Sequence, residues 1–506
     1  MSKLLTLLTL ASLSNPAPVV AEAGANQKST SESDLQQMIA SKLAADGGVQ
    51  ATLNPIDYPN YPAPSHPIGD PANKPFQWYS PINTEDGGLN AWANDPATIL
   101  YDEDSGLYYS WMLFRNGRDF PSGWIEMTSP DMNNWTQGEE RIKEGREFFP
   151  KSFHPSAMGG SVWLDREGQY FDKGDLIFAI SMQDCTLMGG ASMTGDSGIA
   201  YYVSHGFGQP IYKAGIITPQ YINPTGTDWR DSFLYNTDDG LYFAIAADTR
   251  VEFWRINSFN ERDITKVGEI YVRSIGVEVP NVVRFGENEW YISCSIQDAH
   301  LGGPYQSCEW FLCHMEGETF VPYAQGFHEY GTEGYAQRVV NPYQSRIAEF
   351  AISRSMAANW TYNTDIWSWK GGCYGSERMI IRDDKPYLEP YDLIGDYQDN
   401  GTYVYKVKAS DLANGYTLHF DKGDFIFYYG DDRITWDNQV VTDLSKWTTI
   451  GGAATDDDDI TIVINKCTLT FYDEWQGWNA HFMLPEAVVH VPNDGVMSIL
   501  PSPTTV

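Results

Sequence analysis

Three stretches of the chain share one pattern, and this pattern is the strongest constraint on the fold. Each stretch begins near a carboxylate, enters an apolar strand, passes an acidic turn and ends in a strand rich in aromatic residues. They are "NDPATILYDEDSGLYYSWM" from Asn94, "RDSFLYNTDDGLYFAIA" from Arg230 and "EVPNVVRFGENEWYISCS" from Glu278. Short strands separated by Gly, Asp and Asn turns are typical of β-hairpins, so we expect an all-β chain.

Two further stretches have the same form without the leading acid. They are "GGSVWLDREGQYFDKGDLIFAIS" from Gly159 and, more weakly, "SRIAEFAISRSMAANW" from Ser345. Hairpins repeated at such intervals predict the blades of a β-propeller. The interval from Asp231 to Glu278 is the length of one blade, and that from Asp95 to Asp231 corresponds to two or three blades.

The three leading acids, Asp95, Asp231 and Glu278, stand at the same place in the pattern. The innermost strands of a propeller line one central channel, so we expect these acids to meet at its mouth. Like charges that meet in a partly dry pocket separate their pKa values. Cleavage of a glycosidic bond needs such a pair of carboxyl groups. The alternative for each acid alone is a turn or strand-end residue.

Composition restricts the partners. The chain has 506 residues, and its 67 acidic against 33 basic side chains give a net charge of −34. Such a surface repels nucleic acid and anionic membranes, so we predict neither as a partner. A neutral ligand is expected instead, and 17 Trp and 31 Tyr offer faces that stack on sugar rings or fill β-rich cores. The oligomeric state is not predicted.

The length of the chain and the changes in its local composition predict four segments. Residues 1–23, with Lys3, a short apolar run and "AEA", have the form of a secretory signal. Residues 24–75 form a flexible, Pro-rich lead-in. The propeller is expected over 76–390 and a β-sandwich over 400–500. The sequence therefore predicts a secreted protein and no transmembrane segment.

Secretion permits disulfides and glycosylation. Six cysteines are present, and Cys308 and Cys313 are the closest pair; bridges and buried free thiols both fit their scattered spacing. Sequons begin at Asn134, Asn359 and Asn400.

Motifs for other chemistry are absent. The sequence contains no HExxH, GxSxG, Walker loop or CxxC. The acidic run 456–459 lacks the spacing and Gly of a calcium loop, and His154 in "SFHPS" is interpreted as a packing or hydrogen-bonding residue. We predict no metal and no cofactor.

The acid motifs resemble those of glycoside hydrolase family 32, the β-fructofuranosidases (invertases), inulinases, levanases and fructosyltransferases. "WANDPAT" is similar to the motif that carries the nucleophile, which maps to Asp95 with Asn94 beside it. "WRDSF" resembles the motif whose Asp binds fructosyl hydroxyls and stabilises the transition state, which maps to Asp231 beside Arg230. "VEVPNVV" resembles the motif of the acid/base, which maps to Glu278.

Other matches extend the resemblance over about residues 76–490. "WIEMTSPDMNNW" from Trp124 and "MGGSVW" around Ser161 are similar to family motifs, as are "GGCYGSERMIIRDDKPYLEP" and "NKCTLTFYDEW". The resemblance implies a five-bladed propeller followed by a β-sandwich. It also implies that Asn94, Arg230, Trp124 and Ser161 bind substrate.

The resemblance implies a retaining hydrolase of sucrose, inulin or levan, with fructosyl transfer to sugars as a second outcome. Several neighbours of the acids depart from the family pattern, and "DEDSGLYYSWMLFRNG" is similar to a divergent fungal branch that includes sucrose-using fructosyltransferases. Two alternatives stay open. One is an arabinan- or xylan-acting hydrolase of family 43, which carries a similar acid triplet but typically inverts. The other is an inactive sugar-binding propeller.

Overall fold

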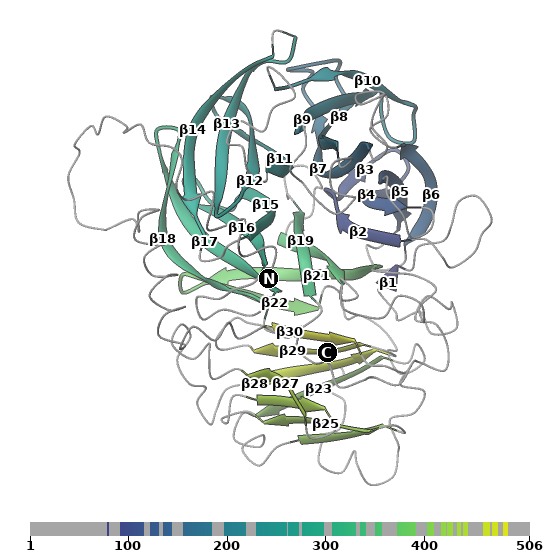
Figure 1. Ribbon diagram of the computed structural model, residues 1–506, viewed down its shortest axis with the longest axis vertical. Coiled ribbons are helices and arrows are strands. Elements are labelled where there is room, and N and C mark those ends of the chain that lie inside the picture. The colour runs from purple at the N-terminus through teal and green to yellow at the C-terminus, as the bar shows by residue number, and fades with distance from the viewer. Residues whose placement is uncertain are drawn as a thin grey trace.

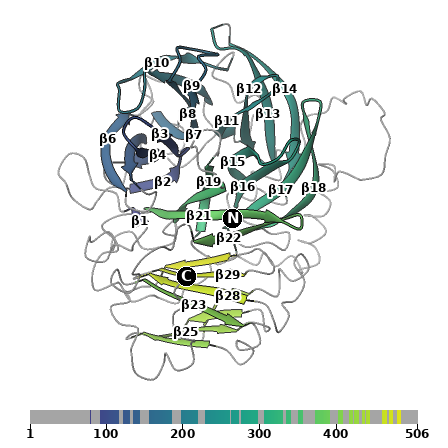
Figure 2. The same cartoon turned by 180° about the vertical axis from the view of Figure 1, so that it is seen from behind.

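The computed structural model is built from β-strands (Figures 1 and 2). It describes residues 78–79, 92–115, 122–130, 135–143, 155–184, 197–218, 229–260, 262–272, 276–297, 306–329, 334–340, 350–356 and 372–390, and the strands between 402 and 483. Every regular element in these ranges is a strand, so none of them contains a helix of the length and apolarity that a membrane span requires.

Five antiparallel sheets follow one another along residues 78–390. The first sheet contains β2 (Trp92–Pro96), β3 (Leu100–Asp102), β4 (Leu107–Arg115), β5 (Gly123–Ser129) and β6 (Thr136–Ile142). The second contains β7 (Pro155–Asp165), β8 (Asp175–Asp184), β9 (Ser197–Ser204) and β10 (Ile211–Ile216). The third contains β11 (Trp229–Thr237), β12 (Gly240–Ala247), β13 (Arg250–Ser258) and β14 (Asp263–Tyr271).

The remaining sheets complete the chain. The fourth contains β15 (Gly276–Arg284), β16 (Trp290–Gln297), β17 (Gln306–Glu316) and β18 (Thr319–Phe327). The fifth contains β19 (Gly334–Val340), β20 (Phe350–Met356), β21 (Gly372–Arg382), β22 (Lys385–Pro390) and β1 (Trp78–Tyr79). Two four-stranded sheets follow, one of β23 (Thr402–Lys408), β28 (Asp459–Asn465), β29 (Thr468–Asp473) and β30 (Asn479–Met483), the other of β24 (Tyr416–Phe420), β25 (Gly423–Tyr428), β26 (Arg433–Trp436) and β27 (Gln439–Asp443).

The first strands of the five sheets, β2, β7, β11, β15 and β19, gather at the centre, as in a β-propeller (Figure 1). Sequence and burial agree with this order. β12, "GLYFAIAA", is buried along nearly its whole length, whereas the outer strand β14, "DITKVGEIY", is mostly half-exposed. Strands covered on both faces are apolar on both, and outer strands carry charges that prevent further pairing. The predicted all-β propeller is confirmed.

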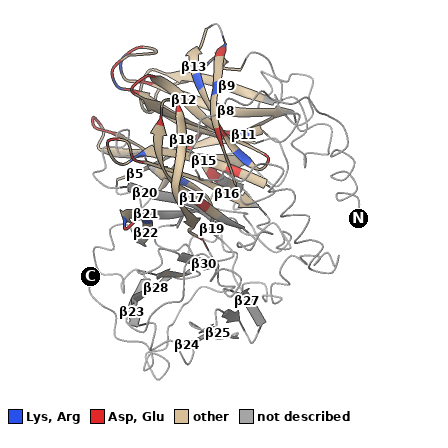
Figure 3. Ribbon diagram, turned by 90° about the vertical axis from the view of Figure 1, so that its left-hand side faces the viewer, with Lys and Arg blue, Asp and Glu red and all other residues tan. Residues whose placement is uncertain are grey.

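The core lies between neighbouring sheets. One cluster joins the first and second sheets and includes Trp111 and Phe178, whose rings meet edge to face at 5.1 Å. A second joins the second and third sheets around Tyr201 and Phe243. Asp and Glu lie in several turns between strands, and others lie on the strands themselves (Figure 3). The ring of sheets also joins its two ends, because Trp78 and Tyr79 of β1 pair with β21 of the fifth sheet.

All five central strands carry a β-bulge at the same place. The register shifts lie between Ala93 and Pro96, Ala157 and Gly160, Arg230 and Phe233, Glu278 and Asn281, and Tyr335 and Arg338. In each case one extra residue bends the strand, which re-aims the side chains that follow. This shared bulge is the structural basis of the repeat that the sequence shows.

The register corrects two details of the predicted repeat. The three acids were expected at the same position of the repeat, but they occupy successive positions of the bulge. Glu278 is at its first position, Asp231 at its second and Asp95 at its third. The fifth hairpin, expected from Ser345, is displaced, because the central strand of that sheet is β19 and the segment from Phe350 is its second strand. Of the two spacings left open for Asp95 and Asp231, the structure has the shorter, two sheets.

Cys308 and Cys313 do not form a disulfide. Both are buried thiols on β17, as is Cys294 on β16. Five residues along one strand span about 16 Å, which is too far for a disulfide between them.

Several sequence predictions lie outside the described residues. They are the signal 1–23, the lead-in 24–75, His154, Cys185, Cys467, the sequons at Asn134, Asn359 and Asn400, and the acidic run before Asp459.

Glu252 on β13 is a buried carboxylate that ties the third sheet together. It accepts hydrogen bonds from the indoles of Trp229 and Trp254, both at 3.2 Å, from Arg250 at 3.0 Å and from Lys266 at 2.9 Å. Burial raises its pKa, but the hydrogen bonds and charges of Lys266 and Arg250 outweigh burial and leave the pKa of Glu252 below its usual range.

We expect Glu252→Gln to lower the free energy of unfolding by about 2 kcal/mol at pH 7. This is less than the about 3–5 kcal/mol typical of breaking a fully buried ion pair, because Lys266 is partly exposed. The Glu252 pKa is lower in the folded than in the unfolded state. Its stabilisation is therefore complete above about pH 4.3 and is lost as pH falls through the folded value. Urea unfolding at pH 7 and at low pH measures both effects. Equal stability of variant and wild type at pH 7 would contradict this account.

Candidate active site

The structure brings the three predicted acids together at the bulges of β2, β11 and β15. Arg230 joins two of them: its Nη2 donates to Oε1 of Glu278, and its Nε lies 3.5 Å from Oδ2 of Asp231. The backbone N–H of Val279 donates to the same Oδ2 at 3.2 Å. The site is therefore built from the first, third and fourth sheets, by residues at the bulges of their central strands.

Asp231 has a backbone conformation that its residue type seldom adopts. Its φ is +63°, and Val279 in the next sheet, at the same bulge position, has a φ of +51°. A non-Gly residue in the left-handed region costs about 1–3 kcal/mol and persists where its surroundings hold it. Here the ion pair with Arg230 and the Val279 amide hold the carboxylate, which is buried to 1% exposure.

The electrostatics of the site favour protonation of the two aspartates. Burial, followed by the charges of Asp231 and Glu278, raises the pKa of Asp95 well above its usual range, although Arg338 and Arg230 act against this. Burial also raises the pKa of Asp231, and the nearby guanidinium of Arg230 offsets only part of that rise. Like charges held together in one buried site do not all ionise at the same pH.

The other predicted binding residues have different positions. Arg230 lies within the acid cluster. Trp124 is buried and its indole N–H donates to the carbonyl of Met158 at 2.9 Å, while the buried Ser161 hydroxyl accepts from the Leu234 amide at 2.6 Å. Trp124 therefore supports the bulge of β7, and Ser161 joins β7 to β11. Their contact with substrate stays a prediction.

Asn94 belongs to β2, next to Asp95, but its side chain lies outside the described part of the chain.

Two residues near the acids were missed in the sequence. Gly159 packs so closely on Asp231 that a Cβ there would lie 2.4 Å from Oδ1. Arg338 on β19 is fully buried among the central strands. Gly159 belongs to "MGGSVW", in which only Ser161 was predicted to have a functional role. Arg338 precedes the fifth predicted repeat, which begins at Ser345.

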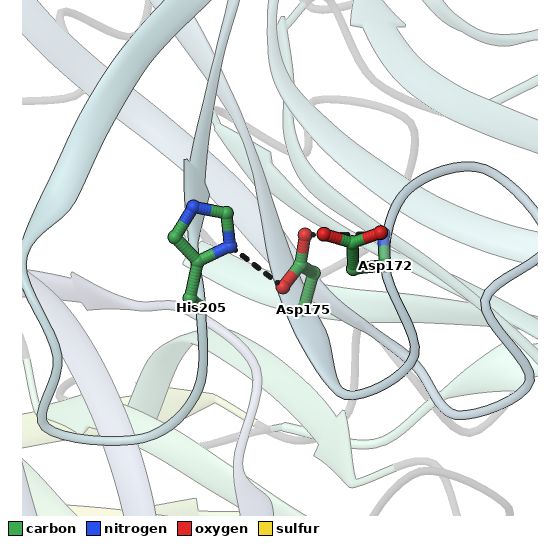
Figure 4. A group of neighbouring side chains, drawn as sticks. All are labelled: Asp172, Asp175 and His205. Atoms are coloured by element: carbon green, nitrogen blue, oxygen red, sulfur yellow. Dashed lines mark hydrogen bonds and ion pairs between the residues drawn. The ribbon is translucent and has the colours of Figure 1, made fainter.

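A group of potential metal ligands lies apart from the acids, at one end of β8 (Figure 4). Asp172, Asp175 and His205 bring their ligand atoms within 4.8 Å of one another. His205 Nδ1 lies 3.0 Å from Oδ1 of Asp175, and the Asp172 amide donates to the other oxygen at 3.2 Å. These two hydrogen bonds explain why the three side chains lie together around the turn before β8. We therefore assign no metal to this group.

A cavity of about 440 Å³ also lies away from the acids. Its lining comes from the fourth sheet and the β21–β22 turn, and includes Glu289, His314, Tyr323 and Arg382. The Tyr323 hydroxyl donates to Glu289 at 2.6 Å, and its ring stacks on His314. None of the three acids lines this cavity, so it plays no part in the site.

Comparison with known proteins assigns the family. The model of the glycosyl hydrolases family 32 N-terminal domain matches residues 88–380, which include β2 to β20, most of β21 and the three acids. The chain belongs to glycoside hydrolase family 32. It is a glycoside hydrolase, and the resemblance read from the acid motifs is confirmed. No curated protein matches the chain.

Solved structures agree in fold. The exo-inulinase of Aspergillus awamori has 15% identity and a TM-score of 0.61, with 81% of this chain and 93% of that one covered. A mutant β-fructofuranosidase of Bombyx mori in complex with sucrose has 14% identity, a TM-score of 0.60 and coverage of 90% and 94%. The sucrose-6-phosphate hydrolase of Lactobacillus gasseri has 15% identity, a TM-score of 0.54 and coverage of 81% and 88%.

Proposed function

We propose that this family 32 hydrolase is a secreted, retaining β-fructofuranosidase that uses sucrose and related fructans. In this assignment Asp95 attacks the anomeric C2 of a β-fructosyl unit. Glu278 protonates the departing oxygen and then deprotonates water or an acceptor sugar. Asp231 binds the ring hydroxyls as positive charge develops. Retention requires the carboxyl groups of Asp95 and Glu278 to lie about 5–5.5 Å apart.

The observation that supports this proposal most directly is the joint placement of the acids. Asp231 and Glu278 share Arg230, and Asp95 interacts electrostatically with both acids and with the positive charges of Arg230 and Arg338. A site in which one carboxyl ionises at the expense of the others suits a nucleophile paired with a proton donor. Membership of family 32 disfavours the arabinan- or xylan-acting alternative.

The substrate class is inferred from charge. The structural neighbours include enzymes described with inulin, sucrose and sucrose-6-phosphate. The acid cluster and the net charge of −34 repel a phosphate group, so we propose neutral sucrose as the donor.

We also propose that the five sheets of residues 78–390 are five propeller blades, that the last two sheets form a β-sandwich, and that residues 1–23 direct secretion.

Methanolysis tests the reaction directly. The purified protein is incubated with sucrose, inulin, levan or sucrose-6-phosphate in water containing methanol, and products are identified by NMR. We expect fructose and methyl β-fructofuranoside from sucrose, with trisaccharide at high sucrose concentration, because a covalent intermediate is open to any acceptor on the same face. Inverted methyl fructoside would contradict retention. Sugar binding without product from any substrate would contradict the proposed activity.

A further inference from the structure

Arg338 occupies the centre of the ring of sheets. Its Nε donates to the carbonyl of Pro96 at 3.0 Å, its Nη1 to that of Pro280 at 2.6 Å and its Nη2 to that of Gly160 at 3.0 Å. Its guanidinium carbon lies 5.5 Å from the centroid of the Phe233 ring. One side chain from the fifth sheet thus contacts the central strand of each of the other four.

Two of the three hydrogen bonds fall at bulges that carry an acid. Pro96 directly follows Asp95, and Pro280 lies two residues after Glu278. Three carbonyls in three strands need donors that diverge in one plane, which a guanidinium supplies and an ammonium does not. The donor geometry of Arg338 therefore fixes how β2, β7 and β15 sit relative to one another.

Arg338 is also a buried positive charge beside the acids. Its side chain has no exposed surface. Burial lowers its pKa to about 10, while Asp231 and Asp95 act in the opposite direction, so it stays charged at neutral pH. A charge in this position favours the ionised form of both aspartates.

We propose that Arg338 is the positioning residue of this active site, holding the central strands in register and supplying the buried positive charge that keeps Asp95 available as a carboxylate. This inference rests on the role proposed above for Asp95. The charged groups facing Arg338 and Asp95 from the described strands are Asp231 and Arg230 on β11 and Glu278 on β15. The bulge of β7 contributes Met158, Gly159 and Gly160, which do not titrate.

The test compares Arg338→Met, Arg338→Lys and a matched control, Gln337→Ala. Gln337 is equally buried on β19 but donates to Tyr291 and Ser293 rather than toward the acids. The readout is the pH profile of kcat/KM on sucrose. We expect the acid limb of Arg338→Met to move up by about one pH unit, because the charge that lowers the nucleophile's pKa is gone. The limbs of Arg338→Lys and Gln337→Ala should stay in place.

Arg338→Lys tests the positioning part separately. It keeps the charge but does not span three carbonyls, so we expect kcat to fall at least about tenfold with the acid limb unmoved. An unmoved limb in folded Arg338→Met would overturn the proposal. If Arg338→Met does not fold, a kcat of Arg338→Lys within about twofold of wild type would overturn it instead.

Thermal unfolding gives a readout that needs no activity. The stability deficit of Arg338→Met should grow between about pH 4 and pH 7, as the acids ionise without their counter-charge. A deficit independent of pH would contradict the electrostatic role. A wild-type protein inactive on every substrate would instead contradict the proposed function, so the two failures are distinguishable.

Discussion

Asp95→Asn should reduce fructose release from sucrose by about 10⁴-fold or more while leaving the protein folded. An amide does not form the fructosyl ester that the retaining reaction requires, so chemistry is lost and not only binding. The substitution replaces one carboxylate oxygen of Asp95 by an amide nitrogen. The backbone pairing of β2 with β4 does not depend on that side chain, so the fold should be kept. Sucrose binding is therefore expected to persist in the variant.

Asp95→Asn should also raise the melting temperature at pH 7. Burial and the neighbouring Asp231 and Glu278 raise the pKa of Asp95. A carboxyl whose pKa is higher in the folded than in the unfolded state destabilises the fold as pH rises above the unfolded value, and fully so above the folded value. Asn removes this cost. Loss of activity with gain of stability distinguishes a functional acid from a structural one.

Calorimetry and initial rates at pH 7 measure the two effects on the same sample. Asp102→Asn is the matched control, because Asp102 caps the β3–β4 turn through the Ser105 and Asp104 amides and lies outside the acid cluster. We expect the activity of that variant to remain within about twofold of wild type. Retained sucrose hydrolysis by Asp95→Asn would contradict the nucleophile assignment.

The pattern of strands was predictable because the hairpins repeat. An acid, an apolar strand, a polar turn and an aromatic strand recur, and each feature has a local cause in strand burial or turn chemistry. The convergence of Asp95, Asp231 and Glu278 followed from the same repeat. Their placement at three successive positions of the bulge did not follow, because a bulge is defined by the pairing of two strands and one strand alone does not reveal it.

The supporting residues were not predictable for a related reason. Arg338 resembles any strand-end arginine until the carbonyls of three other sheets are placed around it. Trp124 and Ser161 belong to motifs that suggest substrate contact, yet their side chains bond to the backbones of Met158 and Leu234. Contacts between sheets that are distant in sequence depend on the closed ring, which no local pattern encodes.

Gly159→Ala should lower kcat/KM by about 10²-fold without touching any proposed catalytic residue in the sequence. An added Cβ would lie 2.4 Å from Oδ1 and 2.9 Å from Cγ of Asp231. The carboxylate must then move, and Asp231 is already held in a left-handed conformation by Arg230 and Val279. A group that stabilises the transition state loses much of its effect when displaced by an ångström.

Two further glycines separate this effect from general damage. A Cβ at Gly268 on β14 would meet Thr319 at an ordinary 3.6 Å, so Gly268→Ala should leave activity and stability near wild type. A Cβ at Gly160 would lie 2.2 Å from the carbonyl oxygen of Ala179, which is backbone, so Gly160→Ala should mainly destabilise the fold. Thermal unfolding and kinetics on all three variants give the comparison.

A double-mutant cycle decides whether Gly159 acts through Asp231. If the added methyl only displaces that carboxylate, Gly159→Ala should cost little more once Asp231 has been changed to Asn. Additive losses would show that the methyl acts elsewhere, for instance on the strand pairing of β7. Strong non-additivity would show that Gly159, which takes no part in the chemistry, is needed because its lack of a side chain leaves room for the Asp231 carboxylate.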